Sequence, residues 1–298
     1  MPKKLAFGFV ADPVAHFNPE SETTLFLMRE IERRGHSIFI CEPKDLFLKQ
    51  NEVWAKGINL ESLDCLFLRK DPPFDLAYLH HLYLLRKLEG KVLMINEPFS
   101  ILAHDEKLSA LDFPYAPKTL VSSDAGQILE WGKRFANGIV VKPIGYSGGN
   151  GIRWLKTNKR RATSDERRIL LKMTDKETRQ VICQEFLSAA KMGDKRILMW
   201  DGKILGAFLR KPKAGEFRAN LHQGGRFVKY RLNACDLKIA KEVGSWCKAR
   251  GLYFVGLDVI GDHLTEINVT SPMGIREVNV LYGKKVEKTM LDSILKKL

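Results

Sequence analysis

Near the C-terminal end, two apolar runs flank a short turn-rich centre, and this arrangement limits the fold more than any other feature of the chain. Residues 255–260 read Val-Gly-Leu-Asp-Val-Ile, residues 261–263 read Gly-Asp-His, and residues 264–268 read Leu-Thr-Glu-Ile-Asn. Strand-like runs on either side of a glycine-containing turn predict a β-hairpin. The polar side chains of this segment then lie on defined faces of a sheet.

The length of the turn decides which side chains share a face. If residues 261–263 form a three-residue loop, Asp258 lies opposite Glu266, and Asn268 follows on the same face. Two facing carboxylates repel each other unless a hard cation lies between them, so this register predicts a magnesium site. A two-residue loop would place Asp258 and Glu266 on opposite faces, and an ordinary polar hairpin would need no metal.

A second feature is a strand that ends in a lysine and runs into a glycine-rich stretch. Residues 139–143 read Ile-Val-Val-Lys-Pro, and residues 145–151 read Gly-Tyr-Ser-Gly-Gly-Asn-Gly. Lys142 and the backbone N–H groups of the stretch offer a cation and several donors to a phosphate chain. The stretch lacks the Gly-Lys-Ser/Thr ending of a Walker A loop, and a flexible turn without a ligand is the alternative.

Two further clusters lie between these features. Residues 183–187 form an apolar segment with one acidic residue, and Gly-Asp-Lys-Arg follows at 193–196. Arginines and glycines then alternate from Arg210 to Arg226. This pattern predicts a mobile loop that closes over anionic groups, and a solvated basic loop is the alternative.

Charge divides the chain into two parts. Residues 1–118 carry 15 Lys/Arg and 17 Asp/Glu, whereas residues 119–298 carry 34 and 18. A basic surface attracts nucleic acid, a nucleotide triphosphate or an acidic substrate, and a surface adapted only for solubility is the alternative. The basic stretch 153–179 contains Trp154 as its one aromatic residue, so its composition does not favour nucleic-acid binding.

The remaining composition is that of a globular chain. No apolar run approaches the roughly 18 residues of a membrane span, so we expect no membrane partner. The five cysteines are odd in number and form no CxxC pair, which excludes an obvious zinc site and favours a reducing compartment, the cytoplasm.

The order of elements predicts three units. Residues 1–118 alternate strands (4–10, 36–41, 65–68 and 92–95) with a helix at 21–34 that Ser21 would cap, which is a doubly wound α/β pattern. Prolines at 114 and 117 suggest a boundary before a second unit, 119–187, with a helix near 124–135 and a strand at 138–142. A third unit, 188–298, contains a helix at 234–250.

Taken in chain order, these motifs resemble the ATP-grasp superfamily. The likeness to bacterial glutathione synthetases is closer and is carried by residues 69–75 (Arg-Lys-Asp-Pro-Pro-Phe-Asp), 193–196, 255–261 and 264–272. The resemblance implies an α/β protein in which an N-terminal Rossmann-like domain is followed along the chain by an ATP-grasp fold. It also implies an ATP-dependent carboxylate–amine ligase.

The resemblance assigns roles to individual residues. At the nucleotide, it implies phosphate contacts from Lys107, Lys142 and Arg196, a lid of backbone amides at Ser147, Gly148 and Gly149, an adenine hinge at Gln184, Glu185, Phe186 and Leu187, and Asp194 near the ribose. At the reacting groups, it implies magnesium ligation by Asp258, Glu266 and Asn268, catalysis by Arg210 with Lys142, and peptide binding by Arg218, Asn220 and Ser271.

The implied reaction transfers the γ-phosphoryl group of ATP to a carboxylate, and an amine then attacks the acyl phosphate. In this family the acid is γ-glutamylcysteine and the amine is glycine. The implied cofactors are ATP and Mg²⁺, with Mn²⁺ as the alternative metal, and the implied assembly is a homotetramer. Residues 211–220 are bulkier and more basic than the family pattern. They leave open another acid and amine pair, such as a glutamate-terminated peptide or protein.

Overall fold

The computed structural model describes residues 3–157, 164–213 and 226–298. Within these residues the chain forms three main β-sheets and one small sheet. Each main sheet is drawn from one of the segments 1–118, 119–187 and 188–298. The division of the chain into domains at these boundaries stays a prediction.

The first sheet is parallel and has the strand order β2-β1-β6-β7. Its elements are β1 (Ala6–Ala11), β2 (Ser37–Cys41), β6 (Cys65–Arg69) and β7 (Leu93–Ile95), with α1 (Thr23–Arg33), α2 (Leu76–Leu85) and α3 (Pro98–Ala103). A small sheet beside it contains β3 (Leu46–Lys49), β4 (Glu52–Ala55) and β5 (Ile58–Asn59). The predicted α/β pattern of this segment is confirmed.

The start of α1 differs from the prediction. The N-cap is Glu22 and not Ser21, because the Glu22 carboxylate accepts hydrogen bonds from the backbone N of Thr24 at 3.0 Å and from its Oγ1 at 2.8 Å. An acceptor at this position satisfies one of the free N–H groups of the first helical turn. Thr23 and Thr24, the first two residues of the helix, are both buried.

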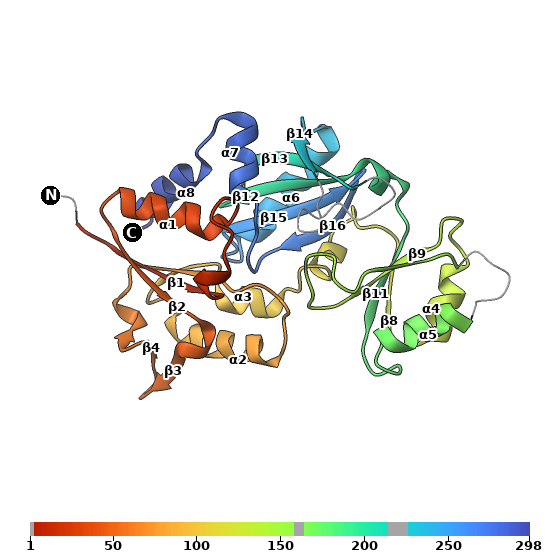
Figure 1. Cartoon of the computed structure of the whole chain (residues 1–298), viewed down its shortest axis with the longest axis horizontal. Coiled ribbons are helices and arrows are strands. Elements are labelled where there is room, and N and C mark those ends of the chain that lie inside the picture. The colour runs from red at the N-terminus through yellow and green to blue at the C-terminus, as the bar shows by residue number, and fades with distance from the viewer. Residues whose placement is uncertain (1–2, 158–163, 214–225) are drawn as a thin grey trace.

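The second sheet is antiparallel and has the order β10-β9-β11-β8. It consists of β8 (Thr119–Ser122), β9 (Ile139–Pro143), β10 (Arg153–Leu155) and β11 (Val181–Glu185), packed with α4 (Ala125–Gly132) and α5 (Ser164–Met173). Figure 1 shows this unit, in yellow and green, extending away from the N-terminal sheet.

The third sheet lies between the other two and has the order β14-β13-β12-β15-β16. It consists of β12 (Asp194–Trp200), β13 (Lys203–Lys211), β14 (Arg226–Lys229), β15 (Phe254–Ile260) and β16 (His263–Asn268), with α6 (Ala234–Lys248), α7 (Ile275–Tyr282) and α8 (Val286–Leu295). All its strand pairs are antiparallel.

The hairpin of β15 and β16 reaches the predicted pairing by a different route. Its loop has two residues and not three, since Ile260 pairs with His263. A register shift then leaves Thr265 as an extra residue, so that Asp258 still pairs with Glu266. The Oγ1 of Thr265 donates to the backbone O of Asp258 at 3.1 Å and anchors this bulge. The predicted three-residue loop is wrong, whereas the facing of the two carboxylates is confirmed.

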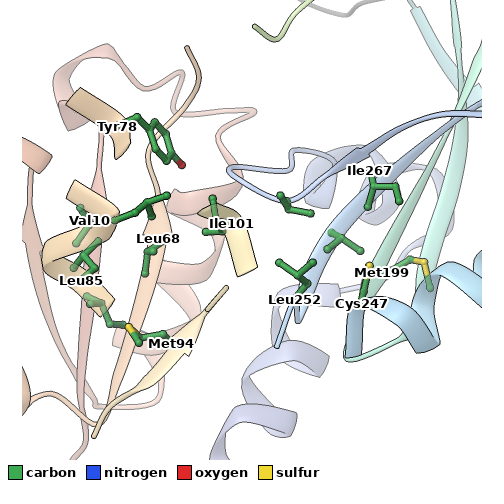
Figure 2. Close-up of a cluster of buried hydrophobic side chains, with 14 of the residues drawn as sticks. Val10, Leu68, Tyr78, Leu85, Met94, Ile101, Met199, Cys247, Leu252 and Ile267 are labelled. Carbon is green, nitrogen blue, oxygen red and sulfur yellow. The ribbon is translucent and has the colours of Figure 1, made fainter. Parts of the chain in front are cut away.

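The core joins the first and third sheets. Figure 2 shows Val10, Leu68 and Ile101 of the N-terminal unit and Leu252 and Ile267 of the C-terminal unit as parts of one buried cluster. The C-terminal helix α8 packs beside α1 (Figure 1). No helix among the described residues is long and apolar enough to cross a membrane.

Candidate active site

A cavity of about 570 Å³ lies where the three main sheets meet. Its second-unit lining includes Val140, Lys142, Ser147, Gly148, Gly149, Ile152, Gln184, Glu185, Phe186 and Leu187. Its third-unit lining includes Asp194, Arg196, Arg210, Asp258, Thr265, Glu266, Asn268, Ser271, Pro272 and Met273. The N-terminal unit contributes Asn18, Glu20, Ser21, Asp71, Pro72 and Glu106.

This lining contains most of the predicted site. Lys107 is the exception among the described residues, because it does not line the cavity. The predicted substrate residues Arg218 and Asn220 lie outside the described residues. The roles assigned to individual residues stay predictions, but the structure brings fifteen of their side chains or backbones to one place.

The glycine-rich loop follows β9 and is shaped by left-handed backbone. Gly145, Gly148, Gly149 and Gly151 have φ angles from 67° to 75°. Side chains rarely adopt this conformation, so glycine is needed at each of these turns. The O of Gly145 accepts a hydrogen bond of 2.7 Å from the N of Phe74, which ties the base of the loop to the N-terminal unit.

Two buried lysines lie close to this loop. Lys142 is 7% exposed, and its Nζ is 3.9 Å from the Oε1 of Glu266. Burial lowers the pKa of Lys142, and the nearby Glu266 carboxylate partly offsets this effect. The Nζ of Lys107 donates a hydrogen bond to the backbone O of Tyr146, a residue of this loop. Lys107 therefore contacts the residue directly before the amides predicted to cover phosphate, and Lys142 lines the same cavity as those amides.

The hinge segment at the end of β11 has its side chains fixed by neighbours. The Nε2 of Gln184 donates to Thr119 at 3.1 Å, and a carboxylate oxygen of Glu185 accepts from the N of Lys118 at 3.1 Å. The ring of Phe186 stacks on Trp154 with centroids 4.3 Å apart. These contacts hold the segment against the β8 and β10 sides of the sheet, next to the apolar residues of the cavity.

Four charged side chains form a buried network on β12, β13 and β15. Arg196 holds Asp258 through two bonds, Nε to Oδ1 at 2.6 Å and Nη2 to Oδ2 at 3.1 Å. The Nη2 of Arg210 is 2.9 Å from the Oδ1 of Asp258, and its Nε donates to Asp194. Burial alone would raise the pKa of Asp258, but the two guanidinium groups outweigh it and hold the pKa below its usual range.

The donor set of the hairpin fits magnesium chemically. Asp258 and Glu266 face each other, and the Nδ2 of Asn268 donates to the O of Gly256 at 2.9 Å, which leaves Oδ1 as its ligand atom. Carboxylate and amide oxygens are ligands that magnesium accepts, together with substrate phosphates. The described residues contain no group of three or more His, Cys, Asp or Glu that could hold a metal. A metal here would need oxygen ligands beyond the two carboxylates.

Several residues that line the cavity were not predicted as site residues from the sequence. Val140, Ile152 and Ile260 supply apolar walls, and each has the appearance of an ordinary strand or loop residue in the sequence. Glu106 is 8% exposed, and its Oε1 accepts from the N of Val269 and from the N and Oγ1 of Thr270. Glu106 directly precedes the predicted phosphate ligand Lys107, and that adjacency was the available signal.

Comparison with known families agrees with this site. The family "Prokaryotic glutathione synthetase, ATP-grasp domain" matches residues 106–283. The family "Prokaryotic glutathione synthetase, N-terminal domain" matches residues 5–61 and 56–101. Together these matches cover most of the chain and include the glycine-rich loop, the hinge and the hairpin.

Curated relatives match over nearly the whole length. A protein of Prochlorococcus marinus subsp. pastoris named "Glutathione synthetase" is 36% identical over 98% of this chain and 99% of its own. The protein of that name from Pseudomonas syringae pv. tomato is 36% identical over 98% of this chain and 97% of its own. A third, from Wigglesworthia glossinidia brevipalpis, is 34% identical, with 98% of each chain covered.

Solved structures show the same fold at low identity. D-cycloserine synthetase DcsG superposes with a TM-score of 0.73 at 13% identity, covering 98% of this chain and 99% of that one. The macrocyclase MdnC of Microcystis aeruginosa superposes with a TM-score of 0.66 at 15% identity, covering 98% and 100%. Because two family models and full-length relatives of more than 30% identity match it, the chain belongs to the prokaryotic glutathione synthetase family, whose members are ATP-dependent ligases that form carbon–nitrogen bonds on an ATP-grasp fold.

Proposed function

We propose that this chain joins γ-glutamylcysteine to glycine and consumes ATP through an acyl phosphate, with release of ADP and phosphate. The observation that carries the proposal is the cavity in which the glycine-rich loop, the hinge and the facing Asp258 and Glu266 meet. The shared name of full-length relatives supports the same reaction. These relatives do not favour the alternative acid and amine pair that residues 211–220 left open.

The proposal places the nucleotide against the part of the cavity that the second unit lines. The apolar walls at Val140, Ile152 and Leu187 suit an adenine ring, and the backbone of the hinge lies beside them. The glycine-rich loop offers backbone amides to the phosphates, and Lys142 adds a buried positive charge. Because Lys142 is little exposed, water screens its charge weakly, and its attraction to a phosphate group is stronger than at the surface.

A divalent metal belongs to the family's chemistry, and we propose Mg²⁺, held by Asp258, Glu266 and Asn268, with Mn²⁺ as the alternative. When bound, such an ion neutralises phosphate charge and draws electrons from the transferring phosphoryl group. The guanidinium groups of Arg196 and Arg210 contact both oxygens of Asp258. A metal held by Asp258 would share these oxygens with the two guanidinium groups.

The chain's own residues perform the remaining tasks. Arg210 is buried next to Asp194 and Asp258 and presents a fixed positive charge to the cavity. This charge stabilises the negative acyl phosphate and the oxyanion that forms when the amine attacks. No protein nucleophile is needed, since the phosphoryl group activates the carboxylate. The glycine-rich loop 145–151, closed over the phosphates, would keep water from hydrolysing the acyl phosphate.

We also propose that the enzyme is located in the cytoplasm. All five cysteines are free thiols, as expected for a cytoplasmic protein. The substrates are a small peptide and an amino acid, and a homotetrameric assembly stays a prediction.

A product assay tests the function directly. The protein is incubated with Mg-ATP, γ-glutamylcysteine and glycine, and products are identified by mass with ADP counted in parallel. We expect one glutathione for each ADP, and no glutathione when glycine is omitted. Glutathione at background level, with efficient ligation of another acid and amine pair, would overturn the substrate assignment and leave the ATP-dependent ligation standing.

A further inference from the structure

Arg69 is a buried arginine that the reaction as described does not use. It ends strand β6, is 3% exposed, and is not among the described residues that line the cavity. Its Nε donates to the Oγ1 of Thr24 at 3.1 Å, its Nη1 donates to the O of Pro272 at 3.2 Å, and its Nη2 is 3.7 Å from the Sδ of Met273. One side chain thus contacts two segments that are far apart in sequence.

The start of α1 completes this contact. The Oγ1 of Thr24 donates to Glu22 at 2.8 Å, and the Nη2 of Arg69 is 3.7 Å from the same carboxylate oxygen. The Oγ1 of Thr23 accepts from the N of Gly274 at 3.3 Å. Both threonines are fully buried. The start of α1, the end of β6 and the loop 272–274 therefore share one desolvated polar network.

Each of these three segments contributes to the cavity wall. Residues 20–21 precede α1, residues 71–72 follow β6, and residues 271–273 belong to the loop, and all line the cavity. None of them belongs to the unit that carries the glycine-rich loop and the hinge. The network therefore shapes the stretches of cavity wall that these three segments supply.

The same loop is also held from the catalytic side. The Nη1 of Arg196 donates to the O of Met273 at 3.0 Å, while the rest of its guanidinium binds Asp258. Two buried arginines from different sheets thus hold the loop at neighbouring residues.

We propose that Arg69 is a positioning residue that sets the geometry of the cavity end where the peptide donor binds. This inference rests on the proposed function, because it takes γ-glutamylcysteine as the occupant of that end. Arginine suits the task since its planar guanidinium donates in several fixed directions at once, which the single ammonium of lysine cannot do. Reacting groups must be held within a fraction of an ångström, so a small loop shift lowers the rate strongly.

The experiment compares Arg69→Met, Arg69→Lys and Thr24→Val with the unchanged protein. We expect Arg69→Met to raise the KM for γ-glutamylcysteine or to lower kcat/KM for it by roughly 10- to 100-fold. Arg69→Lys should recover part of this loss, and Thr24→Val, which removes one Arg69 contact at constant shape, should show a smaller shift of the same kind. Affinity for Mg-ATP, measured directly by calorimetry, should change by less than about twofold.

Glu30→Gln serves as the control. Glu30 is a buried carboxylate of the same helix α1, pairs with Arg33 and Arg34, and is not among the described residues lining the cavity. Its replacement loosens α1 without touching the network, so kinetics should stay near those of the unchanged protein.

The outcomes separate the inference from the function on which it rests. If the unchanged protein makes no glutathione, the proposed function fails and the inference fails with it. If it makes glutathione but Arg69→Met and Thr24→Val leave the dipeptide kinetics unaltered, the inference alone is overturned. Equal losses for dipeptide and nucleotide, or a matching loss in Glu30→Gln, would also overturn it. If Arg69→Met does not fold, the Thr24→Val result decides.

Discussion

Replacement of Arg210 by methionine tests the charge network at the centre of the site. Arg210 is 6% exposed and lies between the carboxylates of Asp194 and Asp258. Its removal leaves Asp258 paired with Arg196 but takes away the ion pair of Asp194. Breaking a buried ion pair by removing one partner costs about 3 kcal/mol or more, so we expect a loss of about 3 kcal/mol at pH 8.

The loss should depend on pH. Burial raises the pKa of Asp194, and Arg210 opposes this effect, so the pKa rises further in Arg210→Met. A carboxyl group whose folded-state pKa lies above its unfolded value destabilises the fold when it is charged. This cost is complete above the folded-state pKa and disappears below the unfolded value near 3.8. The stability difference from the unchanged protein should therefore be largest at pH 8 and shrink toward pH 4.

Urea-induced unfolding of the ligand-free protein, followed by tryptophan fluorescence at several pH values, measures this difference. The control is Lys203→Met, which removes an exposed cation from the same strand β13 and should change stability by no more than about 0.5 kcal/mol. A loss for Arg210→Met below about 1 kcal/mol at pH 8, or one that is constant from pH 4 to pH 8, would refute the reasoning.

Three further predictions concern ligand binding. Gly148→Ala places a methyl group on a residue with a φ angle of 67°, and this left-handed conformation costs alanine about 1–2 kcal/mol. Calorimetry should therefore show the affinity for Mg-ATP reduced by roughly tenfold. An unchanged affinity would argue against a lid in this conformation. Lys142→Met removes a buried cation and should weaken ATP binding at least about tenfold, whereas retained affinity would exclude a phosphate contact. Glu266→Gln keeps the shape but removes one carboxylate charge, so Mn²⁺ binding in the presence of ADP, followed by electron paramagnetic resonance, should weaken; an equal affinity would remove Glu266 from the metal site.

Local sequence patterns determined the elements and the order of the motifs. Apolar runs bounded by turns predicted the strands at 36–41, 65–68 and 138–142 to within one or two residues, because burial of alternate or continuous apolar side chains is a property of the local chain. The glycine-rich stretch 145–151 was predicted to offer backbone donors to phosphate, whereas the left-handed φ angles of four of its glycines were found only in the structure. The small sheet β3–β5 gave no comparable pattern and was not predicted.

The hairpin illustrates the limit of such reasoning. Counting residues gave the correct pairing of Asp258 with Glu266 from a loop of the wrong length, since the bulge at Thr265 restored the register that the two-residue turn would have lost. Strand pairing depends on hydrogen bonds between both strands and their neighbours, and β15 is also paired with β12. A turn sequence alone does not carry that information.

Only the tertiary structure decided which charges meet. The family resemblance implied a phosphate contact for Arg196 and catalysis for Arg210. Packing brings both guanidinium groups onto Asp258, which lies 62 and 48 positions further along the chain. It also brings Arg69 to Pro272, which is 203 positions away. Such contacts leave no local periodicity, because they arise when separate sheets pack and each buried charge must find a partner. The physical reason is that desolvation acts on the whole folded chain, whereas sequence patterns report one element at a time.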